Sequence, residues 1–296
     1  MRKTTLLATT TLAALVLTLL SGAPRGAADP GRGASAPAAA APEVTCRTWL
    51  DFEVDNMWGG RVVENDSIRS EGRSQEVDFR RRTSALIGEF GSDDSYSSDH
   101  LVVTDDGRLL EVRQTHQVGS RKFTVKTLSV PKSDFEPYRF GGQFGSFFTI
   151  SEQGTVHLHE MVGTGDPIKL KEPRELPVKL PNPGGVAVWR MDDQILLYSN
   201  NRESGTLRLV VMPEGKPAQA KGHVIASSGW RTPTHLAAGP CFTPDRTANR
   251  VALLAVNENS GNASLRAHYD PLAHTRTLVD ARQVGKGTWR LDGLGQ

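Results

Sequence analysis

The feature that most constrains the fold is a unit of short β-rich runs that recurs along the chain. In each of four copies, two such runs flank a turn rich in Asp, Gly or Pro. The clearest copy joins residues 100–104 to residues 108–115 through Asp105-Asp106-Gly107. An Asp-Gly turn favours a hairpin because its central residues adopt a positive φ that these residue types tolerate. The sequence therefore predicts antiparallel strand pairs rather than helices.

The other copies repeat this arrangement. Their predicted strand pairs are 145–151 with 155–161, 186–191 with 194–199, and 234–239 with 250–256. A further predicted strand follows each pair, at 123–130, 176–180, 206–212 and 263–269. Turns aligned at Gly107, Gly154, Asp193 and Asn249 lie 47, 39 and 56 residues apart. Units of about 40–50 residues that hold several strands each are typical of β-propeller blades.

The two ends of the predicted domain share a short pattern. Thr48-Trp49-Leu50-Asp51 is echoed by Thr288-Trp289-Arg290-Leu291-Asp292, and the two threonines lie 240 residues apart, or five units of 48. In a closed ring such positions meet, and an N-terminal strand can complete the last blade. We therefore predict an all-β fold, a single β-propeller of about five four-stranded blades. The alternative is a β-sandwich or two small all-β domains.

The N-terminus carries the pattern of an export signal. Arg2 and Lys3 precede an apolar run at residues 6–20, which small residues follow up to Ala28. This order is typical of a secretory signal peptide, and fifteen apolar residues are fewer than the roughly 20 of a membrane anchor. The sequence predicts a signal peptide at 1–28, an Ala/Pro/Gly-rich disordered leader at 29–42 and a propeller domain at 43–296. The mature protein would be secreted, extracellular and without membrane insertion.

The charge balance argues against a polyanionic partner. The chain has 35 basic and 33 acidic residues, and Arg2, Lys3 and Arg25 lie in the predicted signal peptide. The remaining 32 basic residues leave the mature chain with a net charge of −1. A near-neutral chain offers no electrostatic case for binding nucleic acid or an anionic membrane. No feature of the sequence specifies an oligomeric state.

The cysteines indicate a disulfide. Cys46 and Cys241 are the two cysteines of the chain. In an oxidising compartment an even pair is most simply one disulfide bond, and two free thiols are the alternative. Ring closure would bring the N-terminal segment beside the last blades, where the two cysteines could meet.

Catalytic and metal-binding motifs are scarce. His157 and His159 share one face of a predicted strand, but two ligands without a third are a weak metal site. We therefore predict no metal and no cofactor. Paired acids at Asp93-Asp94, Asp105-Asp106 and Asp192-Asp193 could serve a glycosidase. The last two pairs fall in predicted turns, where Asp is favoured for bonding its own backbone. We predict no catalytic residues, although blades far apart in sequence could still supply an active site.

Aromatic residues near glycine-rich loops are the candidate ligand-binding groups. An aromatic ring can cover the C–H face of a sugar while nearby polar groups bond its hydroxyls. Trp230 follows Gly229, where a loop could hold the indole at the surface. The structural alternative is that each ring packs between blades. The candidates are Trp230, Gly229, Trp189, Tyr138 and Trp289.

One segment carries a family resemblance. Residues 228–240 (SGWRTPTHLAAGP), with the later strand at 251–256, resemble the repeat of tachylectin-like five-bladed propeller lectins. The resemblance extends over residues 97–270 as weak copies, of which one carries the Gly-Trp pair. Aromatic pairs usual in the first strand occur at Phe147-Phe148 alone. The resemblance implies several N-acetylhexosamine sites between blades, and loss of Gly-Trp from most copies argues against equal sites.

These observations predict a secreted, non-catalytic, lectin-like protein. Several weak sites around a propeller would bind glycans or a glycosylated surface through multivalency. A secreted propeller glycoside hydrolase or lyase is one alternative. An extracellular protein-interaction or adhesin module is the other.

Overall fold

The computed structural model describes most of the predicted domain. The described residues are 44–54, 57–64, 67–76, 83–91, 97–104, 109–117, 120–127, 139–143, 146–162, 169–243, 246–278, 282–287, 289 and 293–295. The expected signal peptide and leader lie outside these residues. No helix in this part of the chain is long and apolar enough to span a membrane.

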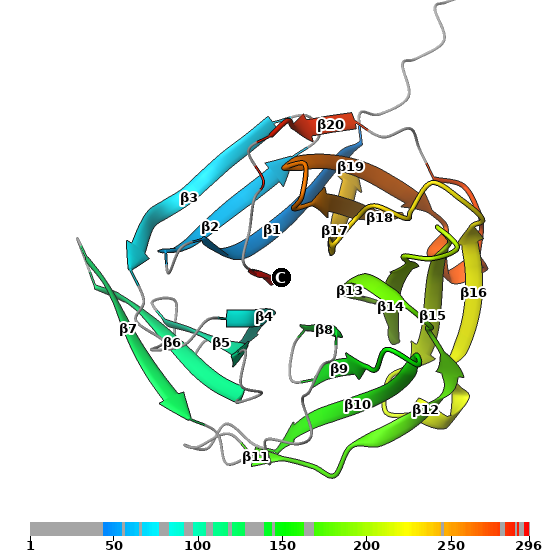
Figure 1. Ribbon diagram of the computed structural model, residues 1–296, viewed down its shortest axis with the longest axis horizontal. Coiled ribbons are helices and arrows are strands. Elements are labelled where there is room, and N and C mark those ends of the chain that lie inside the picture. Colours follow the sequence, from blue (N-terminus) through cyan, green and yellow to red (C-terminus); the bar gives the residue numbers. More distant parts are fainter. Residues whose placement is uncertain are drawn as a thin grey trace, which may run out of the picture. The chain divides into compact units, whose positions relative to one another are not determined.

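Five antiparallel blades follow one another in chain order around a common centre, and hydrogen bonds join the first and last of them into one eight-stranded sheet (Figure 1). Blade 1 contains β1 (Thr45–Val54), β2 (Met57–Glu64) and β3 (Ser67–Glu76). Blade 2 contains β4 (Thr83–Gly91), β5 (Ser97–Thr104), β6 (Leu109–Gln117) and β7 (Ser120–Thr127). Blade 3 contains β8 (Arg139–Gln143), β9 (Ser146–Ile150), β10 (Thr155–Val162), β11 (Lys169–Leu170) and β12 (Arg174–Lys179).

The last two blades are the most completely described. Blade 4 contains β13 (Pro183–Met191), β14 (Gln194–Asn201), β15 (Leu207–Pro213) and β16 (Lys221–Ala226). Blade 5 contains β17 (His235–Thr243), β18 (Arg246–Asn257), β19 (Asn262–Tyr269) and β20 (Arg282–Gly285). Short 3-10 turns occur at Pro217–Gln219 and Pro271–Ala273. The strand β21 (Gly293–Gly295) returns to blade 1, where it pairs with β1.

The innermost strands form a closed ring. Strand β4 lies next to β8, β8 next to β13, β13 next to β17, β17 next to β21, and β21 next to β4. This ring confirms the prediction of a single all-β propeller of about five blades, rather than a sandwich or two small domains. The hydrophobic core lies between successive blades. One cluster lies between blades 3 and 4, another between blades 4 and 5, and a third around the disulfide beside blade 5.

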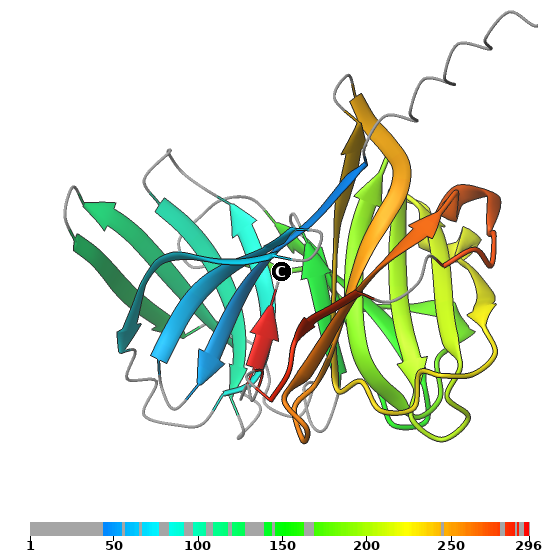
Figure 2. The same ribbon diagram turned by 90° about the horizontal axis from the view of Figure 1, so that it is seen from above.

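The ring closes at the first blade rather than the last. Strand β21 pairs with residues 51–53 of β1 and becomes the innermost strand of blade 1, between β1 and β4 (Figure 2). The expectation that an N-terminal strand completes the last blade is therefore wrong. Residues 235–285 form all four strands of blade 5, whereas residues 45–76 form three strands of blade 1. The strand that was still needed therefore belongs to blade 1.

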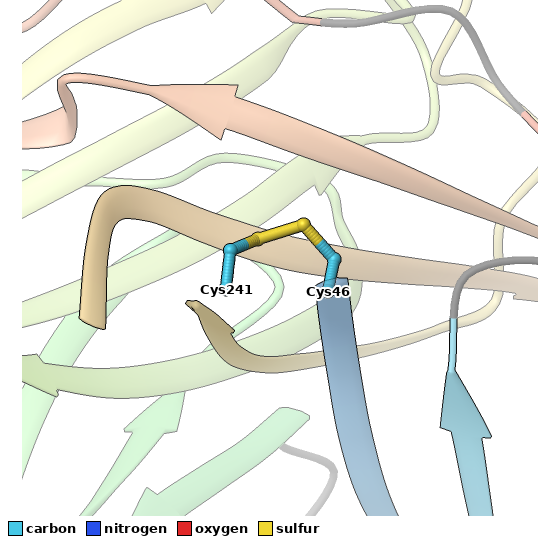
Figure 3. The surroundings of a disulfide bond; sticks show 2 residues. All are labelled: Cys46 and Cys241. Carbon is cyan, nitrogen blue, oxygen red and sulfur yellow. A yellow bond between two sulfur atoms is a disulfide. The ribbon is translucent and has the colours of Figure 1, made fainter. Parts of the chain in front are cut away.

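The disulfide joins the two ends of the ring. Cys46 of β1 and Cys241 of β17 are direct cross-strand partners and form a disulfide, which confirms the prediction (Figure 3). Their Cα atoms lie 4.0 Å apart, across 195 residues of sequence. Gly239 permits the close approach of the two strands. A Cβ at Gly239 would lie 2.0 Å from the carbonyl oxygen of Arg47, closer than any real contact.

The predicted strand pairs are all hairpins in the structure, but their turns are not equivalent. Residues 100–104 lie in β5 and residues 109–115 in β6, the second and third strands of blade 2. Residues 186–191 and 194–199 belong to β13 and β14, the first and second strands of blade 4. Successive turns of an antiparallel sheet lie at opposite ends, so the alignment of Gly107 with Asp193 is wrong. Asn249 lies inside β18 rather than in a turn. Gly107 itself lies outside the described residues.

A repeated hydrogen bond holds each described connection between blades 3, 4, 5 and 1. In each case the donor is a backbone N–H in the segment that follows the outermost strand of a blade. The acceptor is the carbonyl oxygen of a glycine in the turn between the second and third strands of that blade. That glycine has φ between +66° and +85°, a conformation that side chains rarely adopt. The pairs are Leu180 with Gly154 at 2.8 Å, Trp230 with Gly205 at 3.0 Å, and Trp289 with Gly261 at 3.0 Å.

A cleft between blades 4 and 5 as the candidate functional site

A cleft of about 320 Å³ opens beside the connection from β16 to β17. Its walls are Gly229, Trp230, Thr232 and Pro233 of this connection, the β18–β19 hairpin of blade 5, and β20. This volume lies at the lower end of the range of small-molecule sites. Apart from Trp230 and Arg266, its polar walls come from hydroxyl and amide side chains, namely Thr232, Asn257, Ser260, Asn262, Ser264 and Gln283.

The indole of Trp230 forms the buried back of the cleft. Its exposed fraction is 2%, and it packs in the core between blades 4 and 5. The expectation of a surface indole is therefore wrong. The connection crosses the gap between two blades, and the bulky ring fills that gap. Trp230 lines the cleft, but it offers little open ring surface to a ligand.

A buried amide fixes the connection that carries Trp230. Asn200 of β14 is 1% exposed, and its Oδ1 accepts a hydrogen bond from the Gly185 N–H at 2.7 Å. Its Nδ2 donates to the carbonyl oxygens of Trp230 at 2.7 Å and Pro233 at 3.0 Å. Two of these bonds hold the wall in place, and the third fixes the Asn200 side chain to β13. The wall is thereby preorganised for binding, because little conformational freedom remains to be lost.

Arg266 of β19 brings a positive charge to the cleft. Its Cζ lies 4.9 Å from the centroid of the Trp230 ring, within the distance of a cation–π contact. The Nε atom is buried and, within the described part of the chain, has no hydrogen-bond partner. Arginine is always charged and carries donors alone. The cleft therefore holds a cation whose guanidinium is oriented by the Trp230 ring.

The amide groups of the hairpin add further donors. The Oδ1 of Asn257 accepts from the Ser260 N–H at 3.2 Å, and the Oδ1 of Asn262 accepts from the Gly287 N–H at 3.2 Å. Each amide oxygen keeps a second lone pair and each –NH₂ group keeps its donors, so both side chains can still donate and accept. The hairpin therefore offers both kinds of hydrogen-bonding group to a ligand.

The structure brings together two of the five candidate residues from the sequence. Gly229 and Trp230 line the cleft. Trp189 lies on β13, partly buried against the core between blades 4 and 5. Trp289 is fully buried in the core around the disulfide. Tyr138 lies outside the described residues.

Sequence reasoning missed Arg266 and the polar hairpin. The sequence does contain a signal for the hairpin, because one turn pattern occurs twice. The pattern is Asn201-Arg-Glu-Ser-Gly205 in blade 4 and Asn257-Glu-Asn-Ser-Gly261 in blade 5. Each copy precedes a Trp-Arg pair, at Trp230 and Trp289. This pairing predicts which tryptophans occupy equivalent places between blades.

One of the two strand histidines, His159, packs against an aromatic ring of the same blade. His159 stacks on Phe147, with centroids 4.6 Å apart, and its Nε2 lies 3.0 Å from the Thr149 Oγ1. Burial, with a smaller contribution from His157, lowers the pKa of His159 to about 4. Among the residues that the structure describes, no three His, Cys, Asp or Glu side chains are grouped to hold a metal ion.

A second buried histidine links blades 4 and 5. His268 of β19 is fully buried, and its Nδ1 lies 3.0 Å from the hydroxyl of Tyr198 on β14. Its Nε2 lies 2.8 Å from the carbonyl oxygen of Thr275. A carbonyl only accepts, so Nε2 carries the proton and Nδ1 accepts from Tyr198. Burial lowers the pKa of His268, although the bond to Thr275 raises it in part.

These two histidines predict a loss of stability in mild acid. In the unfolded chain both titrate near pH 6.5, whereas the folded protein resists their protonation. Below pH 6.5 the unfolded state therefore binds more protons, and the free energy of unfolding falls as the pH falls. His159 alone is expected to contribute roughly 1 to 3 kcal/mol between pH 6.5 and pH 4. Urea denaturation of the wild type and of His159→Gln over this range measures the contribution. Equal pH dependence in both proteins would contradict it.

Comparison with known proteins gives structural similarity alone. No protein-family model matches the sequence, and no curated protein is significantly similar to it. Similar solved structures include a variant of the Aleuria aurantia lectin in complex with alpha-methyl-L-fucoside, at 11% identity over 82% of this chain and 79% of that one, with a TM-score of 0.45. AofleA from Arthrobotrys oligospora is 12% identical over 82% and 71%, with a TM-score of 0.46. The Dos1 propeller is 9% identical over 81% and 68%, with a TM-score of 0.36. Likenesses this distant assign neither a family nor a ligand.

Proposed function

We propose that the protein is a carbohydrate-binding propeller that holds a sugar in the cleft between blades 4 and 5. The observation that carries the proposal is the convergence of six hydroxyl and amide side chains on one cleft, against an arginine backed by tryptophan. Saccharides present many hydroxyls, each of which can donate and accept, and polar walls of this kind match them. The disulfide is consistent with an extracellular protein.

The number of sites is part of the proposal. In blade 4 the pairing of β14 with β15 places Ser204 at the position of Ser260 and Val210 at that of Arg266. The connection that leads into blade 4 has Leu180 at the position that Trp230 occupies in the connection leading into blade 5. Weaker sites on other blades, as the tachylectin-like resemblance implies, would add avidity. The blade 5 cleft would be the principal one.

Binding without hydrolysis is favoured by the chemistry of the walls. A two-carboxylate glycosidase needs an acid and a base on opposite sides of one bond. None of the described residues that line the cleft carries a carboxylate. The Asp192-Asp193 pair lies in the β13–β14 turn, outside the cleft.

A cleft-blocking substitution tests the proposal. Ser260 is exposed in the β18–β19 turn, so Ser260→Trp should fold and place an indole in the cleft. On a glycan array and by titration with the best glycan, we expect Ser260→Trp to lose roughly tenfold or more in affinity. Ser204→Trp, at the matching turn of blade 4, is the control and should bind as the wild type does. Absence of glycan binding, or equal effects of both variants, would contradict the proposed site.

A further inference from the structure

We infer that this cleft selects acidic saccharides, whose carboxylate or sulfate group bonds the guanidinium of Arg266. The inference rests on the proposed glycan-binding function and specifies its ligand class. A carboxylate and a sulfate ester share the chemistry in question, an oxyanion with several acceptor oxygens.

The charge of the cleft is the first argument. Arg266 is the charged side chain among the described residues lining the cleft, and none of them is acidic. Glu258, in the same hairpin, is bonded to the Nε2 of His235 at 2.8 Å. A partly buried arginine without a neighbouring carboxylate attracts an anion, because desolvation strengthens the interaction relative to water.

The orientation of Arg266 is the second argument. Its guanidinium lies over the Trp230 ring, and that ring is held by the buried packing and the bonds of its backbone. An arginine in this setting presents a planar set of donors, the geometry that binds an oxyanion through two parallel hydrogen bonds. The Nε atom is buried, so the donors that such a group would bond are the Nη–H groups of the guanidinium.

The neighbouring amides are the third argument. The –NH₂ groups of Asn257 and Asn262 add neutral donors to the lining that contains Arg266. A carboxylate or sulfate accepts several hydrogen bonds at once, so it can bond these amides together with the guanidinium.

Matched conjugates measure the preference. The probes are serum albumin carrying β-glucuronide or β-glucoside, which differ in a carboxylate against a hydroxymethyl group, and albumin carrying galactose 6-sulfate or galactose. We expect wild-type protein to bind at least one acidic conjugate roughly tenfold or more tightly than its neutral counterpart. The two acidic arms show which oxyanion is preferred. Raising the salt concentration should weaken the acidic arm more than the neutral one.

Variants assign the preference to the cleft. Arg266→Gln should bring the acidic conjugate down to the affinity of the neutral one. Arg250→Gln is the matched control, since Arg250 lies on the same blade, 3.8 Å over the Tyr269 ring, and does not line the cleft. If Arg266→Gln does not fold by circular dichroism, Arg266→Lys replaces it. Lysine keeps the charge but loses the planar fork, and a several-fold loss on the acidic conjugate is expected.

The outcomes separate the two proposals. Equal binding of acidic and neutral conjugates, or a folded Arg266 variant that binds the acidic conjugate as tightly as the wild type does, would overturn the inference and leave glycan binding standing. Binding to none of the four conjugates, together with no binding on the glycan array, would overturn both.

Discussion

Replacing both Cys46 and Cys241 by alanine is expected to lower the free energy of unfolding by about 4 to 5 kcal/mol. The disulfide closes a loop of 195 residues, and the cost of ordering an open chain grows with the length of the loop. It also ties β1 to β17 at the point where the ring closes, so its loss frees the start of the first blade from the last one. Alanine is chosen because both cysteines are buried and a serine hydroxyl there would need a partner.

Guanidinium denaturation of the wild type, with and without reductant, and of the double variant is the measurement. The reduced wild type and the double variant should unfold at similar, lower midpoints. The oxidised wild type should show no reactive thiol under denaturing conditions. Two titratable thiols, or an unchanged midpoint in the double variant, would contradict the role given to this bond.

Trp230→Ala is expected to lower the free energy of unfolding by about 3 to 5 kcal/mol. The indole is 2% exposed and packs among side chains from both blade 4 and blade 5, so its removal leaves a cavity between blades. The substitution also removes the ring under Arg266. Thermal and chemical denaturation measure the effect, and glycan affinity is compared per folded molecule.

Two further variants serve as controls for this prediction. Trp230→Phe keeps an aromatic ring in the gap and should recover most of the stability. Trp189→Ala removes an indole that is only partly buried on β13 and should cost less. A Trp230→Ala protein as stable as the wild type would show that the ring does not hold the blades together.

The fold was predictable because propeller blades repeat local chemistry. Hairpins such as the one at Gly154 follow from turn residues and alternating runs, and a succession of such hairpins along the chain indicates a propeller even though their turns were misaligned. The cysteine pairing followed from the expected oxidising compartment and from ring closure. The direction of closure did not, because the three residues of β21 carry no pattern that separates them from a turn.

The binding site was only partly predictable. The Gly229-Trp230 pair marked the right connection, but burial of a tryptophan depends on what lies on both sides of it in space. Arg266 became visible only when β19 was placed beside that connection, because the two segments belong to different parts of the repeat. The alignment of the turns at Gly107 and Asp193 was wrong for a related reason, because hairpin turns of similar sequence occur at both ends of a blade.

The most direct test of the account is a crystal structure of the protein soaked with a β-glucuronide or a galactose 6-sulfate, whichever binds more tightly. The account predicts a sugar between residues 229–233 and the β18–β19 hairpin, with its oxyanion within hydrogen-bond distance of the Arg266 guanidinium. A sugar bound elsewhere on the ring, with this cleft unoccupied, would contradict it.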